Sequence, residues 1–380
     1  MWKLAAASLA SLVLGTGLLL QAHSSAAAAP SSSNDPGSSD DPLRLGVIGM
    51  EHGHVHGFLQ ARPYRGIELV GFAESDTALS AKIAEQYDLG RDRLHDTPRA
   101  MLEAESLDAV VVFTNTFDHR RVVELAASHG AHVMVEKPLA VNMEHARAIQ
   151  KAAETHGVHV LVNYETTWYP STERAFALAR EQERLGPLRK VVVRDGHSGP
   201  KEIGVGSAFL SWLTDPKLNG DGALMDFGGY GANLVTWLMD GQRPQTVTAI
   251  TQQFKSDPDY EGVDDEATIL LTYPGTQAII QASWNWPYSR KDLSIYGQRG
   301  YVHADDATQL RVRVGNEEER QLSIEEQPSF YEAAIPYFKK VAQGIIEPDG
   351  LSSLELNMVV TEILDAARRS AKTGRTVSLQ

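Results

Sequence analysis

The sequence predicts an α/β protein with an N-terminal doubly wound parallel sheet and a C-terminal domain built on a large, mostly antiparallel sheet. From residue 43, short and continuously apolar runs alternate with helix-period stretches, the pattern of a parallel sheet covered on both faces. After residue 187, β-rich runs follow one another without an intervening helix, which indicates antiparallel pairing. The length of 380 residues also exceeds what one hydrophobic core usually holds, so two domains are expected.

The N-terminal domain is expected to bind its ligand at the carboxyl ends of its strands, as open parallel sheets do. Helix-period stretches, for example residues 77–87 and 143–156, separate the apolar runs. The predicted strands are residues 43–49, 67–74, 107–114, 132–136 and 159–164.

The C-terminal domain is expected to present one large sheet face. Its aromatic residues include candidates for stacking on a sugar. We select only Trp168 and His197 as substrate residues, because they lie near motif boundaries and most large aromatics simply fill a core. The predicted strands are residues 187–195, 245–254, 267–273, 277–284, 292–296 and 310–314.

The first residues are typical of a secretory signal peptide. One lysine precedes an uncharged and mostly apolar run, and small residues of the Ala-x-Ala kind follow. We therefore expect a signal peptide at 1–29 and secretion or periplasmic export, with an uncleaved membrane anchor as the alternative. A flexible linker at 30–42 is expected to precede the nucleotide-binding domain at 43–163 and the substrate and oligomerisation domain at 164–380.

Composition restricts the class of partner. The formal net charge of -14 argues against nucleic acid and anionic membrane surfaces, because an acidic field repels polyanions. A small neutral substrate fits better. Without a cysteine, the chain forms neither a disulfide nor a thiolate metal site.

The turn after the first strand departs from the dinucleotide fingerprint G-x-G-x-x-G, whose glycines let the backbone approach the pyrophosphate. Gly49 is in place, but Glu51 and His54 occupy the other two glycine positions. A carboxylate there is expected to repel a pyrophosphate. Glu74, which ends the second strand, has the position of an acidic residue that accepts the ribose hydroxyls of NAD and disfavours NADP.

Three histidines, His52, His54 and His56, follow this strand as H-x-H-x-H, a pattern that also opens the metal sites of barrel hydrolases. That alternative would need an eight-strand barrel with further ligands at later strand ends, and the later sequence lacks regular strand-helix alternation. We therefore predict no metal site. Glu51 and His52 are expected to line the phosphate turn or the substrate cleft.

Lys137, Asp226 and Tyr230 together suggest alcohol oxidation. A hydroxyl that loses hydride must also lose its proton, so a base is needed within hydrogen-bond reach. A free tyrosine titrates near pH 10 and needs a nearby cation, here Lys137, to favour its phenolate. Asp226 and Tyr230 are four residues apart and so share a helical face. Taken singly, Lys137 is as well explained as a surface lysine and Tyr230 as a core residue.

These residues and their surroundings resemble the glucose-fructose oxidoreductase, inositol dehydrogenase and rhizopine catabolism superfamily, Gfo/Idh/MocA, over residues 43–380. The resemblance implies a Rossmann domain and a C-terminal α/β domain with an open sheet that often forms dimer contacts, hence a homo-oligomer, dimer or tetramer. It also implies that Lys137 touches substrate and nicotinamide and that Pro138 follows a cis peptide. The matching landmarks are residues 46–49, 108–112 with His119, 133–138, 220–230, 295–297 with Gly300, and 366–370 with Gly374.

The resemblance further assigns cofactor contacts to Thr114, Asn115, His119 and Glu136, although Asn115 stands where the family usually has proline. Many members carry histidine in place of Tyr230, so this chain resembles the tyrosine-type branch, which acts on sugars and dihydrodiols.

We therefore expect an exported oxidoreductase that uses NAD or NADP, either exchanged or held tightly, on a hydroxyl or carbonyl of a sugar or polyol. Two alternatives stay open. One is a glycosidase that retains NAD and works by transient oxidation and elimination. The other is an inactive carbohydrate-binding or regulatory protein of the same fold, for which Glu51 and His54 are the sequence support.

Overall fold

The computed structural model describes residues 41–324 and 330–379. The expected signal peptide and all but the last two residues of the expected linker lie outside these ranges. Within them, no helix combines the length and apolar character needed to cross a bilayer.

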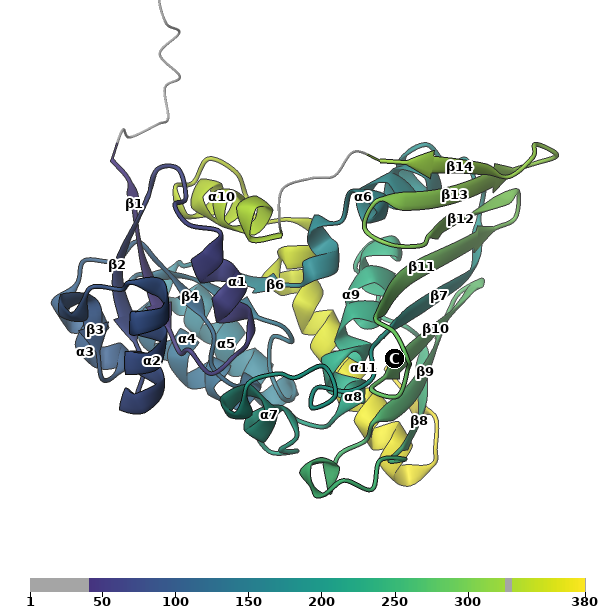
Figure 1. Ribbon diagram of the computed structural model, residues 1–380. Coiled ribbons are helices and arrows are strands. Elements are labelled where there is room, and N and C mark those ends of the chain that lie inside the picture. The colour runs from purple at the N-terminus through teal and green to yellow at the C-terminus, as the bar shows by residue number, and fades with distance from the viewer. Residues whose placement is uncertain (1–40, 325–329, 380) are drawn as a thin grey trace, which may run out of the picture. The chain divides into compact units, whose positions relative to one another are not determined.

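The N-terminal sheet has six strands in the order β3-β2-β1-β4-β5-β6, all parallel (Figure 1). This confirms the predicted doubly wound sheet; β3, only two residues long, was not predicted. The strands are β1 (Leu43–Ile48), β2 (Ile67–Ala73), β3 (Leu94–His95), β4 (Ala109–Val112), β5 (His132–Glu136) and β6 (Val160–Asn163). The helices between them are α1 (His54–Gln60), α2 (Thr77–Tyr87), η1 (Arg91–Arg93), α3 (Pro98–Ala104), η2 (Thr116–Asp118), α4 (His119–Ser128) and α5 (Met143–His156).

Side-chain caps fix where several of these helices begin. Asp76, Thr97 and Asn142 accept hydrogen bonds from backbone N–H groups in the first turns of α2, α3 and α5, which satisfies donors that a helix start leaves without partners. The strand order reverses between β1 and β4, and at such a point the carboxyl ends of the strands leave a crevice for a ligand. Gly49, Glu74 and Glu136 all lie at strand ends on this edge.

The C-terminal sheet has nine strands in the order β14-β13-β12-β11-β7-β10-β9-β8-β15. Only the β7–β10 pair is parallel, so the predicted mostly antiparallel sheet is confirmed. The strands are β7 (Leu188–Gly196), β8 (Thr246–Gln252), β9 (Glu266–Tyr273), β10 (Thr276–Ser283), β11 (Arg290–Gly297), β12 (Gly300–Ala304), β13 (Gln309–Val314), β14 (Arg320–Ser323) and β15 (Val377–Ser378).

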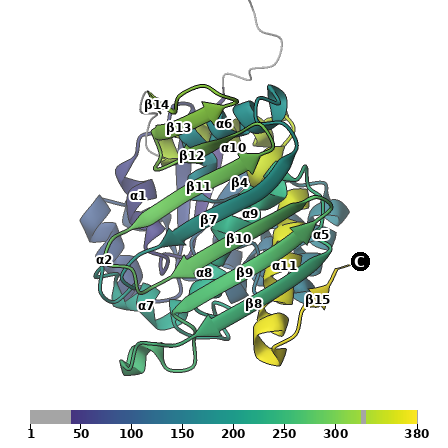
Figure 2. The same cartoon turned by 90° about the vertical axis from the view of Figure 1, so that its right-hand side faces the viewer.

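Helices cover one face of this sheet, and Figure 2 shows the opposite face turned toward the viewer. Helices α8 and α9 contact β9, β10 and β7, and α11 lies against β8, α9 and α5. The helices of this half are η3 (Glu165–Trp168), α6 (Pro170–Phe176), the π-helix η4 (Ala177–Glu181), α7 (Ser207–Leu213), α8 (Ala223–Asp226), α9 (Gly228–Leu238), η5 (Pro258–Tyr260), α10 (Phe330–Ala342), η6 (Gly350–Ser352) and α11 (Leu354–Thr373).

Helix α10 belongs to the core of the N-terminal sheet, although its residues fall within 164–380. Tyr331, Ile335 and Phe338 share one apolar cluster with Phe58 of α1 and Phe113 at the end of β4. The tyrosine ring contacts both phenylalanine rings edge to face. The N-terminal core is thus completed by residues from near the end of the chain.

The short helix α8 is held at its start by a buried carboxylate. Asp264 accepts hydrogen bonds from the N–H of Gly222 at 2.9 Å and of Leu224 at 2.8 Å. The backbone of Gly222 lies so close to that of Asp264 that a Cβ atom would overlap the Asp264 carbonyl oxygen. Because α8 ends at Asp226, this contact helps to position a candidate catalytic residue.

We expect Gly222→Ala to destabilise the fold by roughly 3 kcal/mol, because the new methyl group meets backbone that cannot rotate away. Urea unfolding measures the change. Gly206→Ala is the matched control, since a Cβ there has no atom within 4 Å; its effect should stay within about 0.5 kcal/mol. Equal stability of the two variants would contradict the proposed tight contact.

Candidate functional site

Lys137 and Asp226 form an ion pair that joins the end of β5 to the end of α8. Both are buried, with 5% and 4% of their surface exposed. Trp284 Nε1 donates to the second oxygen of Asp226 at 2.9 Å. Burial opposes ionisation, but Lys137 and these hydrogen bonds hold the pKa of the Asp226 carboxyl below its ordinary value. The peptide bond between Lys137 and Pro138 is cis, as the family resemblance implies.

Tyr230 lies beside this ion pair and is 2% exposed. Lys137 Nζ is 5.5 Å from the centroid of its ring. Burial, with added repulsion from Glu165, Asp226 and Glu136, raises the pKa of Tyr230 well above its ordinary value. In this state of the protein, burial and the surrounding carboxylates therefore outweigh the effect expected of Lys137, and Tyr230 keeps its proton.

Asp226 and Tyr230 meet Lys137 together although they lie on two helices. Helix α8 ends at Asp226 and α9 begins at Gly228. Phe227 between them keeps right-handed helical dihedral angles, so the four-residue spacing still places both side chains on one side. The structure thus brings the three predicted catalytic residues together.

Gly49 makes the turn after β1 in a left-handed conformation, with φ of 80°. A Cβ atom there would come within 2.8 Å of the backbone nitrogen of Thr114. Only glycine therefore allows this turn to pack against the end of β4.

Glu51 accepts two hydrogen bonds from Asn115, which lies between β4 and η2. Its Oε1 accepts from the backbone N–H of Asn115 at 2.7 Å and from the Asn115 side-chain amide at 2.8 Å. Burial, with repulsion from Glu74 and Asp118, raises the pKa of Glu51 although these hydrogen bonds lower it. The carboxylate at the fingerprint position is thus fixed, and its proton affinity is increased.

Glu74 also holds the turn after β1. Its two oxygens accept from the N–H of Met50 at 2.7 Å and of Asp76 at 2.9 Å. An ionised carboxylate has about four acceptor positions, so both oxygens can accept further hydrogen bonds. The geometry is compatible with the ribose role predicted for Glu74.

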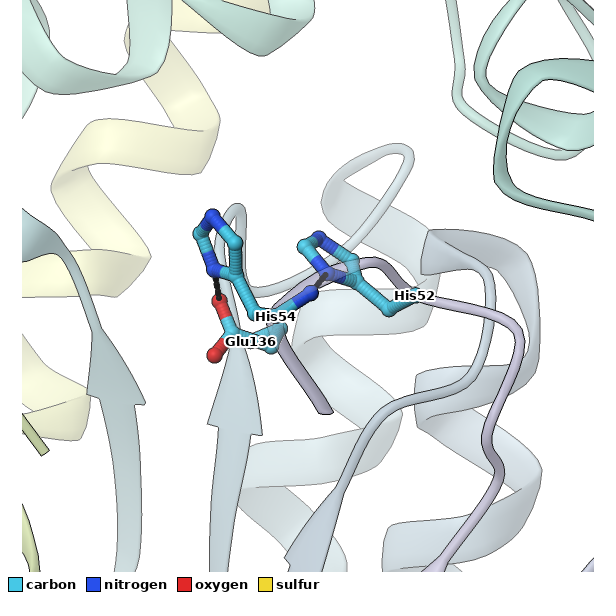
Figure 3. A group of neighbouring side chains, drawn as sticks. All are labelled: His52, His54 and Glu136. Carbon is cyan, nitrogen blue, oxygen red and sulfur yellow. Dashed lines mark hydrogen bonds and ion pairs between the residues drawn. The ribbon is translucent and has the colours of Figure 1, made fainter. Parts of the chain in front are cut away.

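His52, His54 and Glu136 converge over the carboxyl end of β5 (Figure 3). His54 Nδ1 donates to Glu136 Oε2 at 3.0 Å, and the other Glu136 oxygen accepts from the Tyr331 hydroxyl at 2.8 Å and from Asn163. Burial alone would raise the pKa of Glu136, but His54 and these hydrogen bonds hold it below its ordinary value.

The possible ligand atoms of these three residues all lie within 4.8 Å of one another, which is close enough for one metal ion. His52 Nδ1 accepts the backbone N–H of His54 at 3.1 Å, so the neutral ring carries its proton on Nε2 and offers that atom no lone pair for an ion. His56, the third histidine of the motif, instead bonds the Tyr87 hydroxyl at 2.9 Å. As folded, the group is a His54–Glu136 hydrogen-bonded pair beside a neutral His52.

His119 and Thr114 lie on the same edge of the sheet. The Nδ1 of His119 donates to the Leu139 carbonyl at 3.2 Å, and its Nε2 is buried without a hydrogen-bond partner among the described residues. Burial lowers the pKa of His119 to about 4, so the ring is neutral near pH 7. Thr114 donates to the Asn115 carbonyl at 3.2 Å.

The two predicted substrate residues lie in different places. His197 contacts the ring of Phe227, next to Asp226, at 4.9 Å between centroids. Trp168 instead donates to Asn163 at 2.9 Å, and its ring contacts Tyr337 of α10. It lines a separate cavity of about 490 Å³ with Tyr169, Trp237 and Tyr337.

Sequence reasoning did not identify three residues that contact the proposed centre. Trp284 was not selected as a site residue, yet its indole N–H donates to Asp226 and orients that carboxylate. Lys291 of β11 lies 4.8 Å from the Tyr230 ring centroid and pairs with Glu165 of η3. Neither Lys291 nor Glu165 belongs to a motif, so only the β7–β11 pairing and the turn after β6 bring them together.

The residues on this edge fit a dinucleotide at two of its three parts. Glu74 suits the adenosine ribose, and Lys137, Asn115 and Glu136 offer polar groups where the nicotinamide end belongs. The pyrophosphate position fits less well, because Glu51 is acidic and Phe209 of α7 would lie 3.2 Å from a Cβ on Gly53.

The fold and this arrangement are those of an NAD-binding oxidoreductase. Residues 43–164 match the model of an oxidoreductase family with an NAD-binding Rossmann fold, and residues 176–303 match the GFO/IDH/MocA C-terminal domain. The chain belongs to the GFO/IDH/MocA oxidoreductase family, which confirms the resemblance seen in the sequence.

Named relatives are dehydrogenases that act on CH–OH groups. The chain is 25% identical to pig trans-1,2-dihydrobenzene-1,2-diol dehydrogenase over 70% of this chain and 74% of that protein. It is 24% identical to the scyllo-inositol 2-dehydrogenase (NADP(+)) IolU of Bacillus subtilis, over 71% and 79%. An inositol dehydrogenase homolog from Azotobacter vinelandii, solved with NAD+, superposes with a TM-score of 0.76 at 19% identity, over 89% of this chain and 97% of that one, and shows the shared fold.

We expect the protein to lose stability in acid through His119. Its pKa is about 4 when folded and near 6.5 when unfolded, so the unfolded chain binds more protons between these values. Stability is therefore fully present above about pH 6.5 and falls by about 3 kcal/mol as the pH drops to about 4. His119→Gln, which retains a donor for Leu139, should flatten this dependence by a similar amount.

Urea unfolding at several pH values measures the slope. Comparison at alkaline pH separates any general loss of stability in the variant from the titration. An unchanged slope in the variant would contradict a neutral, buried His119.

Proposed function

We propose that this chain is an exported enzyme that transfers hydride between NAD and a hydroxyl or carbonyl group of a sugar or polyol. The observation that carries the proposal is the Lys137–Asp226 ion pair beside Tyr230, at the carboxyl edge of the nucleotide-binding sheet. The named relatives support the substrate class, since one acts on a diol and another on an inositol.

Lys137 is placed to polarise the substrate oxygen. Its ammonium group carries three protons, and Asp226 accepts only one of them through Oδ1. The remaining donors can serve an alcohol or carbonyl oxygen. Trp284 fixes the other oxygen of Asp226, so the carboxylate cannot rotate freely away from the lysine.

Tyr230 is proposed to exchange the proton. Oxidation removes a hydride from carbon and a proton from the attached hydroxyl, and the bound nicotinamide supplies the hydride chemistry. Because its pKa is raised, Tyr230 holds its proton in the resting protein. That form donates to a carbonyl oxygen in reduction; oxidation requires the cations around the ring to favour the phenolate.

NAD is the proposed cofactor in preference to NADP. Glu74 is ordered at the end of β2 by two backbone N–H groups, and a carboxylate there favours free ribose hydroxyls over a ribose phosphate. Replacing Glu74 with glutamine should reduce the preference for NAD over NADP. The ratio of the dissociation constants for NADP and NAD measures this preference.

Export and assembly are further parts of the proposal. The first 29 residues have the composition of a cleaved signal peptide, so the mass of the exported protein should correspond to a chain that lacks them. A homo-oligomer is proposed because one face of the C-terminal sheet is left uncovered by helices, and open sheets of this family often form dimer contacts. A native mass spectrum showing a single chain would contradict that part.

A binding protein without turnover is the second candidate. Glu51 and the close packing of Phe209 over Gly53 favour it, because both weaken the fit of a pyrophosphate. The measurement of bound or added dinucleotide separates the two candidates, since a binding protein of this kind would ignore NAD and NADP.

We expect purified protein to bind NAD and to reduce it with at least one member of a panel of inositols, pentoses and hexoses. Tyr230→Phe should lower the rate by roughly 10² to 10⁴, and Lys137→Ala should abolish it. Exposed Lys151 of α5 gives the control variant Lys151→Ala, which should keep the wild-type rate.

Lys137→Ala leaves Asp226 buried without its partner, which costs stability. Lys137→Met with Asp226→Asn removes both charges, and loss of turnover in that folded variant would identify a chemical role for the pair. Unchanged turnover in Lys137→Ala, or a wild-type pH profile in Tyr230→Phe, would eliminate the proposed centre.

We expect Glu51→Gln to tighten NAD binding about ten-fold, or 1.4 kcal/mol. The amide oxygen can still accept from Asn115, while the negative charge near the pyrophosphate is lost. Wild-type affinity should rise as the pH falls toward the raised pKa of Glu51, because protonation removes the same charge. The variant should lose that dependence. Calorimetry measures both, and weaker binding by Glu51→Gln would contradict electrostatic repulsion.

A further inference from the structure

A second ion pair lies against the proposed acid–base residue. Lys291 of β11 pairs with Glu165 of η3, and its Nζ is 4.8 Å from the centroid of the Tyr230 ring. Lys137 is farther from that centroid, at 5.5 Å. Tyr230 therefore has two cations close to its ring, and each cation is paired with its own carboxylate.

Both members of the second pair are fixed by their surroundings. The Tyr169 hydroxyl donates to the other oxygen of Glu165 at 2.5 Å. Lys291 pairs across the sheet with Asp195 of β7, so the two side chains start from the same face. A cation near an aromatic face also restrains the ring.

Lys291 forms its ion pair with Glu165 and not with Asp195, its neighbour across the sheet. Asp195 is 1% exposed, and neither of its carboxyl oxygens has a hydrogen-bond partner among the described residues. Burial, opposed by Lys291, raises the pKa of Asp195 well above its ordinary value. Lys291 is paired with Glu165, so the charge nearest the Tyr230 ring belongs to an ion pair.

The two ion pairs differ in accessibility. The side chains of Lys137 and Asp226 are 6% and 5% exposed, whereas those of Lys291 and Glu165 are 22% and 27% exposed. The second pair can therefore be altered without leaving a fully buried charge alone. Several elements contribute the titratable groups that face Tyr230. They are Glu136 and Lys137 at the end of β5, Tyr164 after β6, Glu165 of η3 and Tyr169 after it, Asp226 of α8, Lys291 of β11 and Tyr331 of α10.

We propose that Lys291 and Glu165 are positioning residues that hold the Tyr230 ring and set its strength as an acid and base. The proposal rests on the proposed function, in which Tyr230 exchanges the proton of the substrate. Lys291 stabilises the phenolate form of Tyr230, and Glu165 stabilises the phenol form. Together they set a pKa for Tyr230 that neither residue would give alone.

The test is the pH dependence of kcat/KM for alcohol oxidation in two single variants and their combination. Lys291→Gln should move the limb assigned to Tyr230 up by about one pH unit, and Glu165→Gln should move it down by a similar amount. The double variant should return close to the wild-type position, because the opposing charges are removed together. Lys291→Arg keeps the positive charge, so its limb should stay close to the wild-type position.

Asp305→Asn provides the matched control. It removes one carboxylate from an ion pair with Arg311 near another strand of the same sheet and should leave the limb in place. Shifts of Lys291→Gln and Glu165→Gln in the same direction, or rate losses without any shift, would reduce the pair to a structural role and overturn the proposal.

A measurement without turnover separates this proposal from the proposed function. Protein labelled with 3-fluorotyrosine gives a fluorine signal for residue 230, which is assigned by its loss in Tyr230→Phe. Glu165→Gln should lower the titration midpoint of that signal relative to wild type, and Lys291→Gln should raise it. If the two midpoints shift in opposite directions in a protein that turns over no substrate, the role of the ion pair is supported and the proposed enzymatic function is contradicted. If the midpoints do not move in an active enzyme, the enzymatic function is supported and the role of the ion pair is contradicted.

Discussion

The buried ion pair between Lys137 and Asp226 is the constraint on which the rest of the site depends. It joins the residue after a strand of one sheet to the last residue of a short helix on the other. An apolar pair of similar size would hold these elements at least as well, whereas one charge left alone would cost about 3–5 kcal/mol. Stability alone therefore does not account for the charges, which agrees with the chemical role proposed for them. Trp284 orients Asp226, and Asp264 fixes the start of the helix that carries it.

Charge balance then governs Tyr230. Two lysines and several carboxylates surround one buried phenol, and the carboxylates together with burial favour its protonated form. Such an arrangement responds strongly to small changes, because each charge acts over a few ångströms with little water to screen it. A substrate oxygen that draws Lys137 away from Asp226 would change the electrostatic environment of Tyr230 at the moment when proton transfer is required.

The sequence predicted what is local and missed what depends on distant partners. Most strands were recognisable from apolar or β-rich runs. Strands β12 and β14, with five and four residues, were missed, and β3 and β15, with two residues each, carry no period. Lys137, Asp226 and Tyr230 could be found because each belongs to a motif. The bond between Glu51 and Asn115 crosses 64 residues, and Lys291 is a lone lysine on a strand. Trp168 was selected for its position near a motif, but its ring packs against Tyr337, which no local pattern reveals.

Helix α10 carries a consequence for the order of folding. Its residues Tyr331, Ile335 and Phe338 fill the N-terminal core against Phe58, and Tyr331 also bonds Glu136 at the cofactor edge. During synthesis the six parallel strands are complete long before this helix exists, so the nascent domain must keep an apolar surface exposed until the final part of the chain emerges. A fragment cut after the sixth strand would carry that surface permanently. The nucleotide-binding half of this protein is thus a domain by topology, but its apolar core is complete only when α10 is in place.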